Sequence, residues 1–175
     1  MNRQTIILGG GCFWCVEAVY RRIDGVVELE SGYAGGTTEH PTYHQVCTGE
    51  TGHAEVVRIT FDADVITLRE IIDFFWKAHD PTTLNRQGAD IGTQYRSIIL
   101  YTSEEQRRVA EESRDEAQRS FADPIVTTIE QAKHFYPAEE YHQKYYEENP
   151  RQGYCRAVIE PKLRKLGFDG HVFSS

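Results

Sequence analysis

Apolar runs and alternating segments predict five β-strands along this chain of 175 residues. A short run of β-branched residues is typical of a buried strand. Strict alternation of apolar and polar residues is typical of a strand with one face in water. The predicted strands cover residues 5–8, 26–33, 54–61, 97–101 and 125–129.

Apolar residues at helical spacing predict helices between these strands. Val16 and Val19 belong to one apolar stripe after the first strand, and a capping box at Thr67–Glu70 opens a second amphipathic helix. Two further helices are predicted at residues 103–121 and 139–148, and a final turn at residues 162–166.

The first six elements run β-α-β-β-α-β, which is the order of a ferredoxin-like split βαβ core. We therefore expect an α+β fold with helices on one face of a mixed or antiparallel sheet. A later helix, a strand and an irregular C-terminal tail would be additions to this core. No internal repeat or linker interrupts the pattern, so residues 1–175 are predicted to form a single domain.

Composition excludes several classes of protein. The net charge of −8 and the lack of a basic run argue against a nucleic-acid partner. No apolar run approaches the roughly 18 residues that a membrane span needs, and the chain enters a strand at once, which leaves no room for a signal peptide. The four cysteines are then expected to serve redox or metal chemistry. Together these features predict a soluble, cytoplasmic, monomeric enzyme.

A glycine turn, Gly9–Gly11, separates the first strand from the first helix, and Cys12 follows it at the helix start. Free N–H groups and the helix dipole favour an anion there, so the Cys12 thiol is expected to be pushed toward the nucleophilic thiolate. Phe13 and Trp14 beside it can wall off an apolar pocket. We interpret this stretch as a redox or nucleophilic cysteine site.

Cys12 and Cys15 form a Cys-x-x-Cys pair, whose spacing suits either disulfide exchange or a zinc knuckle. The strand–turn–helix context favours redox chemistry. The alternative, one reactive and one packed cysteine, is common and fits Cys15 well. Glu17 on the same helix is interpreted as a solvent-facing residue that is favourable to the helix dipole.

Two long stretches without periodicity, residues 34–52 and 82–96, are expected to be functional loops. They contain Tyr43, Asp90 and Tyr95, whose side chains can hydrogen-bond a substrate. Tyrosines in loops are often packing residues, so these side chains alone assign no role.

Cys47 lies in the first of these loops, with His40, His44 and His53 nearby, but no pair among them has a well-defined zinc-finger spacing. A free loop thiol is the favoured interpretation of Cys47, and no metal site is predicted.

Glu55 shares one face of its predicted strand with Val57, Ile59 and Phe61. A carboxylate among large apolar residues is costly unless it is paired or protonated, and burial would raise its pKa. The alternative is an edge glutamate in solvent, and the pattern favours neither.

Cys155 follows a stretch, residues 150–154, that looks flexible. A mobile cysteine suits a thiol that must travel to another sulfur, whereas a cysteine buried in the last packed segment is the alternative. Its position does not decide between them.

Together these residues resemble the methionine sulfoxide reductase A family, the peptide-methionine (S)-S-oxide reductases, and the resemblance covers nearly the whole chain. The motifs, in order, are Gly11-Cys12-Phe13-Trp14 with Glu17, Gly32-Tyr33-Ala34-Gly35-Gly36, Pro41-Thr42-Tyr43, Thr51-Gly52-His53-Ala54-Glu55, His79-Asp80-Pro81, Arg86-Gln87-Gly88-Ala89-Asp90, Gly92-Thr93-Gln94-Tyr95-Arg96-Ser97, Ala138-Glu139, Tyr141-His142-Gln143 and Gly153-Tyr154-Cys155.

The resemblance implies reduction of the S epimer of methionine sulfoxide, free or in oxidised proteins, to methionine. Cys12 would be the nucleophile and Glu55 the acid that protonates the departing oxygen. The family's substrate-binding positions match a set of five residues. These are Phe13 and Trp14 for the methyl group, Tyr43 and Tyr95 for the oxygen, and Asp90 in the same pocket.

The product would be a sulfenic acid on Cys12, which a second thiol converts to a disulfide. The resemblance implies that Cys155 is this resolving thiol, with Cys15 as the alternative, and that thioredoxin is the external reductant. No bound cofactor is implied. The same residues leave two other classes of function open: a general dithiol oxidoreductase that uses Cys12 with Cys15, and a zinc-stabilised binding domain.

Overall fold

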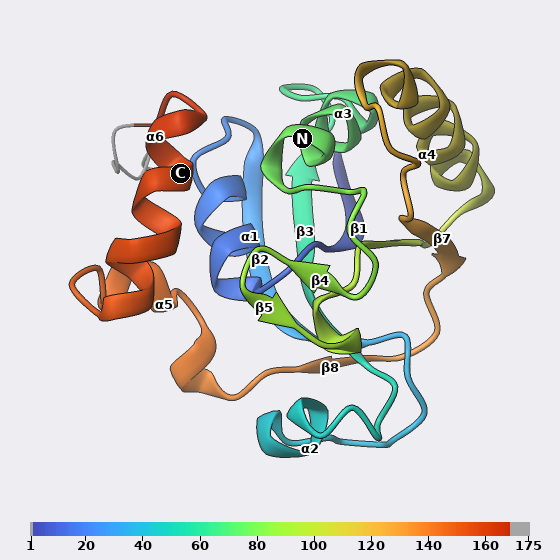
Figure 1. Ribbon diagram of the computed structural model, residues 1–175. Coiled ribbons are helices and arrows are strands. Elements are labelled where there is room, and N and C mark those ends of the chain that lie inside the picture. Colours follow the sequence, from blue (N-terminus) through green and yellow to red (C-terminus); the bar gives the residue numbers. More distant parts are fainter. Residues whose placement is uncertain (1, 169–175) are drawn as a thin grey trace.

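The computed structural model describes residues 2–168, and its centre is a six-stranded sheet in the order β7-β6-β1-β3-β2-β8 (Figure 1). The strands are β1 (Arg3–Gly9), β2 (Val26–Ala34), β3 (Ala54–Asp62), β6 (Ile98–Tyr101), β7 (Thr128–Gln131) and β8 (Phe135–Pro137). All neighbours are antiparallel except β6 and β7, which are parallel, so the sheet is mixed.

The four inner strands follow the order β6-β1-β3-β2. The chain passes from β1 through α1 (Phe13–Tyr20) to β2, and from β3 through α3 (Leu68–Ala78) to β6. Each of these connections leaves room for one strand between its ends, as a split βαβ core requires. The expected α+β fold with a mixed sheet is confirmed.

Alternation along the strands divides the apolar residues between two faces. Ile6 and Leu8 of β1 belong to the main core cluster, which they share with α1 and α3, whereas Ile7 belongs to a smaller cluster with Val56 and Ile98. Burying one such aliphatic side chain stabilises the fold by about 1.5–3 kcal/mol. The larger cluster therefore holds α1 and α3 against its face of the sheet. The long helix α4 (Glu104–Ala117) packs against α3.

The two long loops contain short elements that periodicity did not reveal. The first carries α2 (Tyr43–Cys47), which opens with a capping box between Thr42 and Gln45. The second carries a small hairpin, β4 (Arg86–Gln87) with β5 (Asp90–Ile91), and a 3₁₀ turn, Thr93–Tyr95. A further 3₁₀ turn, Gln118–Ser120, extends α4. These elements are too short for a sequence window to detect.

The C-terminal region is more ordered than expected. The helix predicted at residues 139–148 is split into a 3₁₀ turn, Glu140–His142, and α5 (Tyr145–Glu148). The prediction of an irregular tail at Cys155 is wrong, because a π-helical turn, Cys155–Ile159, leads directly into α6 (Glu160–Lys165). These C-terminal elements lie along α1 (Figure 1), because their apolar side chains pack against that helix in the main core cluster. None of the helices described is long and apolar enough to cross a membrane.

Candidate active site

The end of β1 and the start of α1 place Cys12. Gly10 approaches His79 so closely that an added Cβ would lie 2.8 Å from the imidazole ring, and Gly11 has a φ of +92° that L side chains rarely adopt. Cys12 then takes an extended conformation as the N-cap of α1, as its position in the sequence predicts. Only glycines permit this sharp transition from strand to helix.

The thiol of Cys12 does not have the lowered pKa that its place at a helix start predicts. Burial raises the pKa of Cys12 well above its ordinary value, and negative charge on Glu55 and on Cys15 raises it further. A hydrogen bond from the backbone N–H of Trp14 acts in the opposite direction but is the weaker effect. The expectation of a resting thiolate is therefore wrong, because desolvation outweighs the helix start.

Glu55 lies on β3 beside Cys12 and is 1% exposed, so the interpretation of an edge glutamate in solvent is wrong. Its Oε1 accepts a hydrogen bond of 3.1 Å from the backbone N–H of Phe13. Its Oε2 is buried and has no partner among the residues described. Burial raises the pKa of Glu55 to about 8, so the side chain is a neutral acid at neutral pH. A buried acid with one free oxygen can donate a proton to a bound molecule.

Tyr43 opens α2, and its backbone N–H donates to Oε2 of Glu139 at 2.9 Å. Tyr95 ends the 3₁₀ turn after the β4–β5 hairpin. Burial, followed by the charge of Glu55, raises the pKa of both phenols. Both tyrosines are thus protonated hydrogen-bond donors close to Glu55.

Asp90 lies in β5, and its Oδ2 accepts a hydrogen bond of 2.6 Å from the hydroxyl of Tyr154. The charge of Asp90 raises the pKa of Glu55 and of Cys12, so these three side chains are close together. The sequence-based interpretation of Asp90 did not include Tyr154 as its partner, because 64 residues separate them.

Phe13 and Trp14 form part of an aromatic cluster. The ring of Phe13 is 1% exposed and lies 5.7 Å from the ring of Tyr33 between centroids. The indole of Trp14 is half-buried and stacks on Tyr145, with centroids 3.6 Å apart and planes inclined by 4°. These contacts hold both side chains beside Cys12 in fixed orientations.

His142 lies in the middle of this cluster, and the sequence interpretation gave it no role. It is 1% exposed, its ring is 4.6 Å from that of Tyr43 between centroids, and its Nδ1 accepts a 3.1 Å hydrogen bond from Nε1 of Trp14. Burial lowers the pKa of His142, so the ring is neutral and its proton is on Nε2. That Nε2 is buried without a partner among the described residues. Nothing in the local sequence around residue 142 signals this arrangement.

A cavity of about 150 Å³ lies against Cys12 and is also lined by Cys15, Asp90 and Tyr154. Cys15 is 4% exposed, as its place among apolar helix residues suggested, and its Sγ is 3.7 Å from the hydroxyl of Tyr154. The two sulfurs of the Cys-x-x-Cys pair therefore face one shared space.

Cys155 is fully buried, with no exposed surface, so its place in a packed helical turn replaces the mobile tail that was one interpretation of the sequence. Burial raises the pKa of Cys155 to about 11, and the charges of Cys15 and then Glu147 add to this shift. Cys15 thus lies near both Cys12 and Cys155. Cys47 is exposed at the end of α2, and all four cysteines are free.

His53, which follows the first loop, uses both ring nitrogens in hydrogen bonds to the backbone. Nδ1 of His53 accepts from the N–H of Gly36 at 3.0 Å, and Nε2 donates to the carbonyl of Thr38 at 2.6 Å. Among residues 2–168, no group of three or more His, Cys, Asp or Glu side chains is arranged to hold a metal ion. His53 instead ties together the two ends of the loop that carries Tyr43.

The interpretation of Glu17 as a solvent-facing residue is wrong. Glu17 is 2% exposed and accepts hydrogen bonds from three parts of the chain. Its partners lie 14 and 127 residues away in sequence, on β2 and before α5, so the helical pattern around residue 17 does not reveal them.

Comparisons with known proteins agree with this geometry. The model of the family described as peptide methionine sulfoxide reductase matches residues 4–169. A peptide methionine sulfoxide reductase MsrA from Leptospira borgpetersenii is 59% identical over 162 residues, covering 93% of this chain and 92% of that protein. The MsrA of Saccharolobus solfataricus is 55% identical over 163 residues, with 93% and 92% covered.

Two solved structures of a yeast protein resemble this chain. Reduced Mxr1 from Saccharomyces cerevisiae superposes with a TM-score of 0.84 at 41% identity, covering 88% of this chain and 90% of that one. Mxr1 in complex with Trx2 superposes with a TM-score of 0.60 at 31% identity, covering 82% and 85%.

Proposed function

The chain belongs to the peptide methionine sulfoxide reductase family, and we propose that Cys12 is the thiol with which it attacks the substrate. It is an oxidoreductase that reduces methionine sulfoxide to methionine with thiols and uses thioredoxin as reductant, consistent with the complex of its relative Mxr1 with Trx2. The observation that carries the role of Cys12 is its position beside a buried, protonated Glu55 that has one unpartnered oxygen.

Glu55 supplies the proton that the reaction needs. As the Cys12 sulfur attacks the sulfoxide sulfur, the sulfoxide oxygen gains negative charge and becomes a good leaving group only when it is protonated. The raised pKa of about 8 keeps the Glu55 proton available at neutral pH. The Cys12 proton is lost as its sulfur bonds to the substrate sulfur, and the protonated oxygen leaves the substrate as water. Water then attacks the Cys12 sulfur of the resulting sulfonium, the S–S bond breaks, and the released proton returns to Glu55. Methionine and a sulfenic acid on Cys12 are the products.

The tyrosines and the aromatic wall select the substrate. Tyr43 and Tyr95, protonated phenols near Glu55, hydrogen-bond the sulfoxide oxygen. The methyl group packs against Phe13 and Trp14, where burial of one methyl group contributes about 0.8 kcal/mol. Asp90 completes the polar side of the pocket. When the oxygen and the methyl group are held and the sulfur faces Cys12, only one configuration at sulfur fits, and the family resemblance implies that this is the S epimer.

A second thiol must remove the hydroxyl from the Cys12 sulfenic acid. Cys15 is one helical turn from Cys12 and lines the same cavity, so it is the thiol best placed to meet the sulfenic acid. A Cys12–Cys15 disulfide forms and the hydroxyl leaves as water with the Cys15 proton. Cys155 then attacks the Cys15 sulfur, Cys12 leaves as a thiolate, and thioredoxin reduces the Cys15–Cys155 disulfide with two electrons. Cys155 is thus the last of the three thiols to be oxidised.

Disulfide mapping tests this order. After one equivalent of methionine sulfoxide and alkylation, digestion without reductant is expected to yield mainly a Cys15–Cys155 peptide from the wild type. Cys155→Ser is expected to accumulate a Cys12–Cys15 disulfide, and Cys15→Ser a Cys12 sulfenic acid that dimedone captures.

Both variants should still form one methionine per enzyme in the first turnover, and Cys47→Ser is the matched control for loss of a thiol. If Cys15→Ser forms a Cys12–Cys155 disulfide as fast as the wild type forms its own disulfide, Cys155 is the direct resolving thiol and Cys15 has no part in the transfer.

A further inference from the structure

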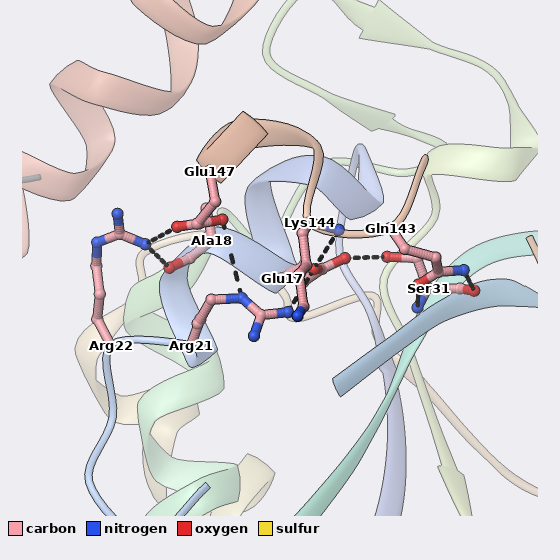
Figure 2. A network of polar contacts seen from close by, with 8 residues as sticks. All are labelled: Glu17, Ala18, Arg21, Arg22, Ser31, Gln143, Lys144 and Glu147. Atoms are coloured by element: carbon pink, nitrogen blue, oxygen red, sulfur yellow. Dashed lines mark hydrogen bonds and ion pairs between the residues drawn. The ribbon is translucent and has the colours of Figure 1, made fainter. Parts of the chain in front are cut away.

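Glu17 is a buried carboxylate inside a helix, held by hydrogen bonds from three segments of the chain (Figure 2). Its Oε2 accepts from the hydroxyl of Ser31 at 2.7 Å, and its Oε1 accepts from Nη2 of Arg21 at 2.6 Å and from the backbone N–H of Lys144 at 2.7 Å. A carboxylate is retained in such a place only when its oxygens are satisfied. Glu17 therefore joins α1 to β2 and to the turn before α5.

The bond to Lys144 holds an unusual backbone conformation. Lys144 has φ +53° and ψ +34°, in the left-handed region, where a residue with a Cβ costs of order 1–2 kcal/mol. The side-chain amide of the preceding residue, Gln143, bonds both backbone groups of Ser31. Its Oε1 accepts from the Ser31 N–H and its Nε2 donates to the Ser31 carbonyl, at 2.9 Å each. The turn is thus fixed from one side by Ser31 and from the other by Glu17.

This turn sets the position of an aromatic ring beside the active site. Tyr145 follows Lys144 directly, and its ring stacks on the indole of Trp14. Trp14 is three residues before Glu17 on α1, and residues at this spacing lie on one face of a helix. A closed path of contacts therefore runs from Glu17 through Lys144 and Tyr145 to Trp14.

We propose that Glu17 is a positioning residue for the substrate's methyl pocket. By holding the N–H of Lys144, it keeps Tyr145 stacked on Trp14, so that the indole presents a fixed wall to the methyl group. This proposal rests on the role given above to Trp14. The ion pair between Arg22 and Glu147, with 2.8 Å between Nη1 and Oε1, fixes the other end of α5. Arg21 also links Glu17 to this end, with its Nη2 2.6 Å from Oε1 of Glu17 and its Nε 3.8 Å from Oε2 of Glu147.

Substitution of Glu17 tests the proposal by separating the hydrogen bond from the charge. Glu17→Leu removes the acceptor for Lys144, and we expect kcat/KM for methionine sulfoxide to fall about tenfold, mainly through a higher KM, because a displaced wall weakens substrate contact. Glu17→Gln keeps an oxygen that can accept from Lys144, and it is expected to stay within about twofold of the wild type.

Two further variants serve as backup and control. If Glu17→Leu does not fold, Glu17→Asp takes its place. Its carboxylate is one methylene too short to reach the N–H of Lys144, so we expect the same fall in kcat/KM. Glu28→Leu makes the same change at an exposed position of β2 and should leave kinetics unchanged.

A spectroscopic readout distinguishes positioning from general support of the fold. In protein labelled with 5-fluorotryptophan, the ¹⁹F signal of Trp14 is expected to shift in Glu17→Leu, while that of Trp76, which is buried against Ser113, stays in place. Equal shifts of both signals would mean that Glu17 supports the whole fold and would overturn the proposal.

A double-mutant cycle tests the path itself. If Glu17 acts through the stacked ring, Glu17→Leu adds nothing to Tyr145→Leu, whereas independent effects would multiply and contradict the proposal. The variant Trp14→Ala distinguishes a failure of the role proposed for Trp14 from a failure of the role proposed for Glu17. An unchanged KM in that variant removes the proposed role of Trp14, whereas a raised KM with an unaffected Glu17→Leu removes only the role of Glu17.

Discussion

Replacement of Cys12 by serine is expected to lower kcat/KM for the S epimer of methionine sulfoxide by more than about 10³-fold. A serine hydroxyl stays protonated at neutral pH and forms no sulfenic acid, so neither product formation nor the later disulfide can follow. The change should not disturb the fold, because Cys12 is the N-cap of α1 and serine is among the best N-cap residues.

The measurement is a single turnover without thioredoxin, in which methionine is quantified after the reaction is quenched. Cys47→Ser provides the matched control, because Cys47 is exposed at the end of α2 and takes no part in the proposed chemistry. A stoichiometric burst of methionine from Cys12→Ser would show that another group attacks the sulfoxide, and the assignment of the nucleophile would be wrong.

Glu55→Gln is expected to slow formation of the sulfenic acid by about 10² to 10⁴-fold, the range over which a positioned acid or base contributes. The amide keeps the size of the side chain and can still accept from the N–H of Phe13, but it has no proton of suitable acidity for the departing oxygen. Rapid-quench measurement of methionine isolates this first step. Glu50→Gln, the same change at an exposed residue, is expected to have no effect. Equal first-turnover rates for Glu55→Gln and the wild type would remove Glu55 from the mechanism.

The pH dependence of the same step follows from the raised pKa of Glu55. The required form is the protonated one, so the contribution of Glu55 is constant below about pH 8 and falls above it. Stability shows the same titration. The folded protein holds this proton more tightly than the unfolded chain does. The contribution of Glu55 to the free energy of unfolding is therefore complete below about pH 4.5 and is lost as the pH rises toward about 8. In Glu55→Gln, the free energy of unfolding should not show this decline with rising pH. If it declines as in the wild type, a group other than Glu55 is titrating.

The residues that sequence reasoning located correctly are those whose environment is set by their own strand or helix. Glu55 shares its face with Val57 and Phe61 because side chains alternate along β3, and the structure buries all three together. Cys12 precedes α1 because three glycines break the strand at that point. In both cases the pattern that places the residue lies within ten residues, although for Glu55 it left open whether the side chain is buried or in solvent.

The residues that were misjudged depend on distant partners. Glu17 is buried by Ser31 and Lys144, and His142 is oriented by Trp14, which is 128 residues away. The pKa of Cys12 was misjudged for a related reason: the dipole of α1 is local, whereas the desolvation that outweighs it comes from the packing of several segments. A pattern read within one element contains none of this information.

The burial of Cys15 and Cys155 has a consequence for survival of the enzyme under oxidative stress. Peroxides react with exposed thiolates, whereas thiols that are enclosed and protonated react slowly. Burial raises the pKa of all four thiols, and Cys15 and Cys155 are also enclosed, so these two are poor targets for such oxidants in the resting protein, whereas Cys12 is half-buried and Cys47 is exposed. An enzyme built in this way keeps its second and third thiols reduced until Cys12 has reacted with a sulfoxide.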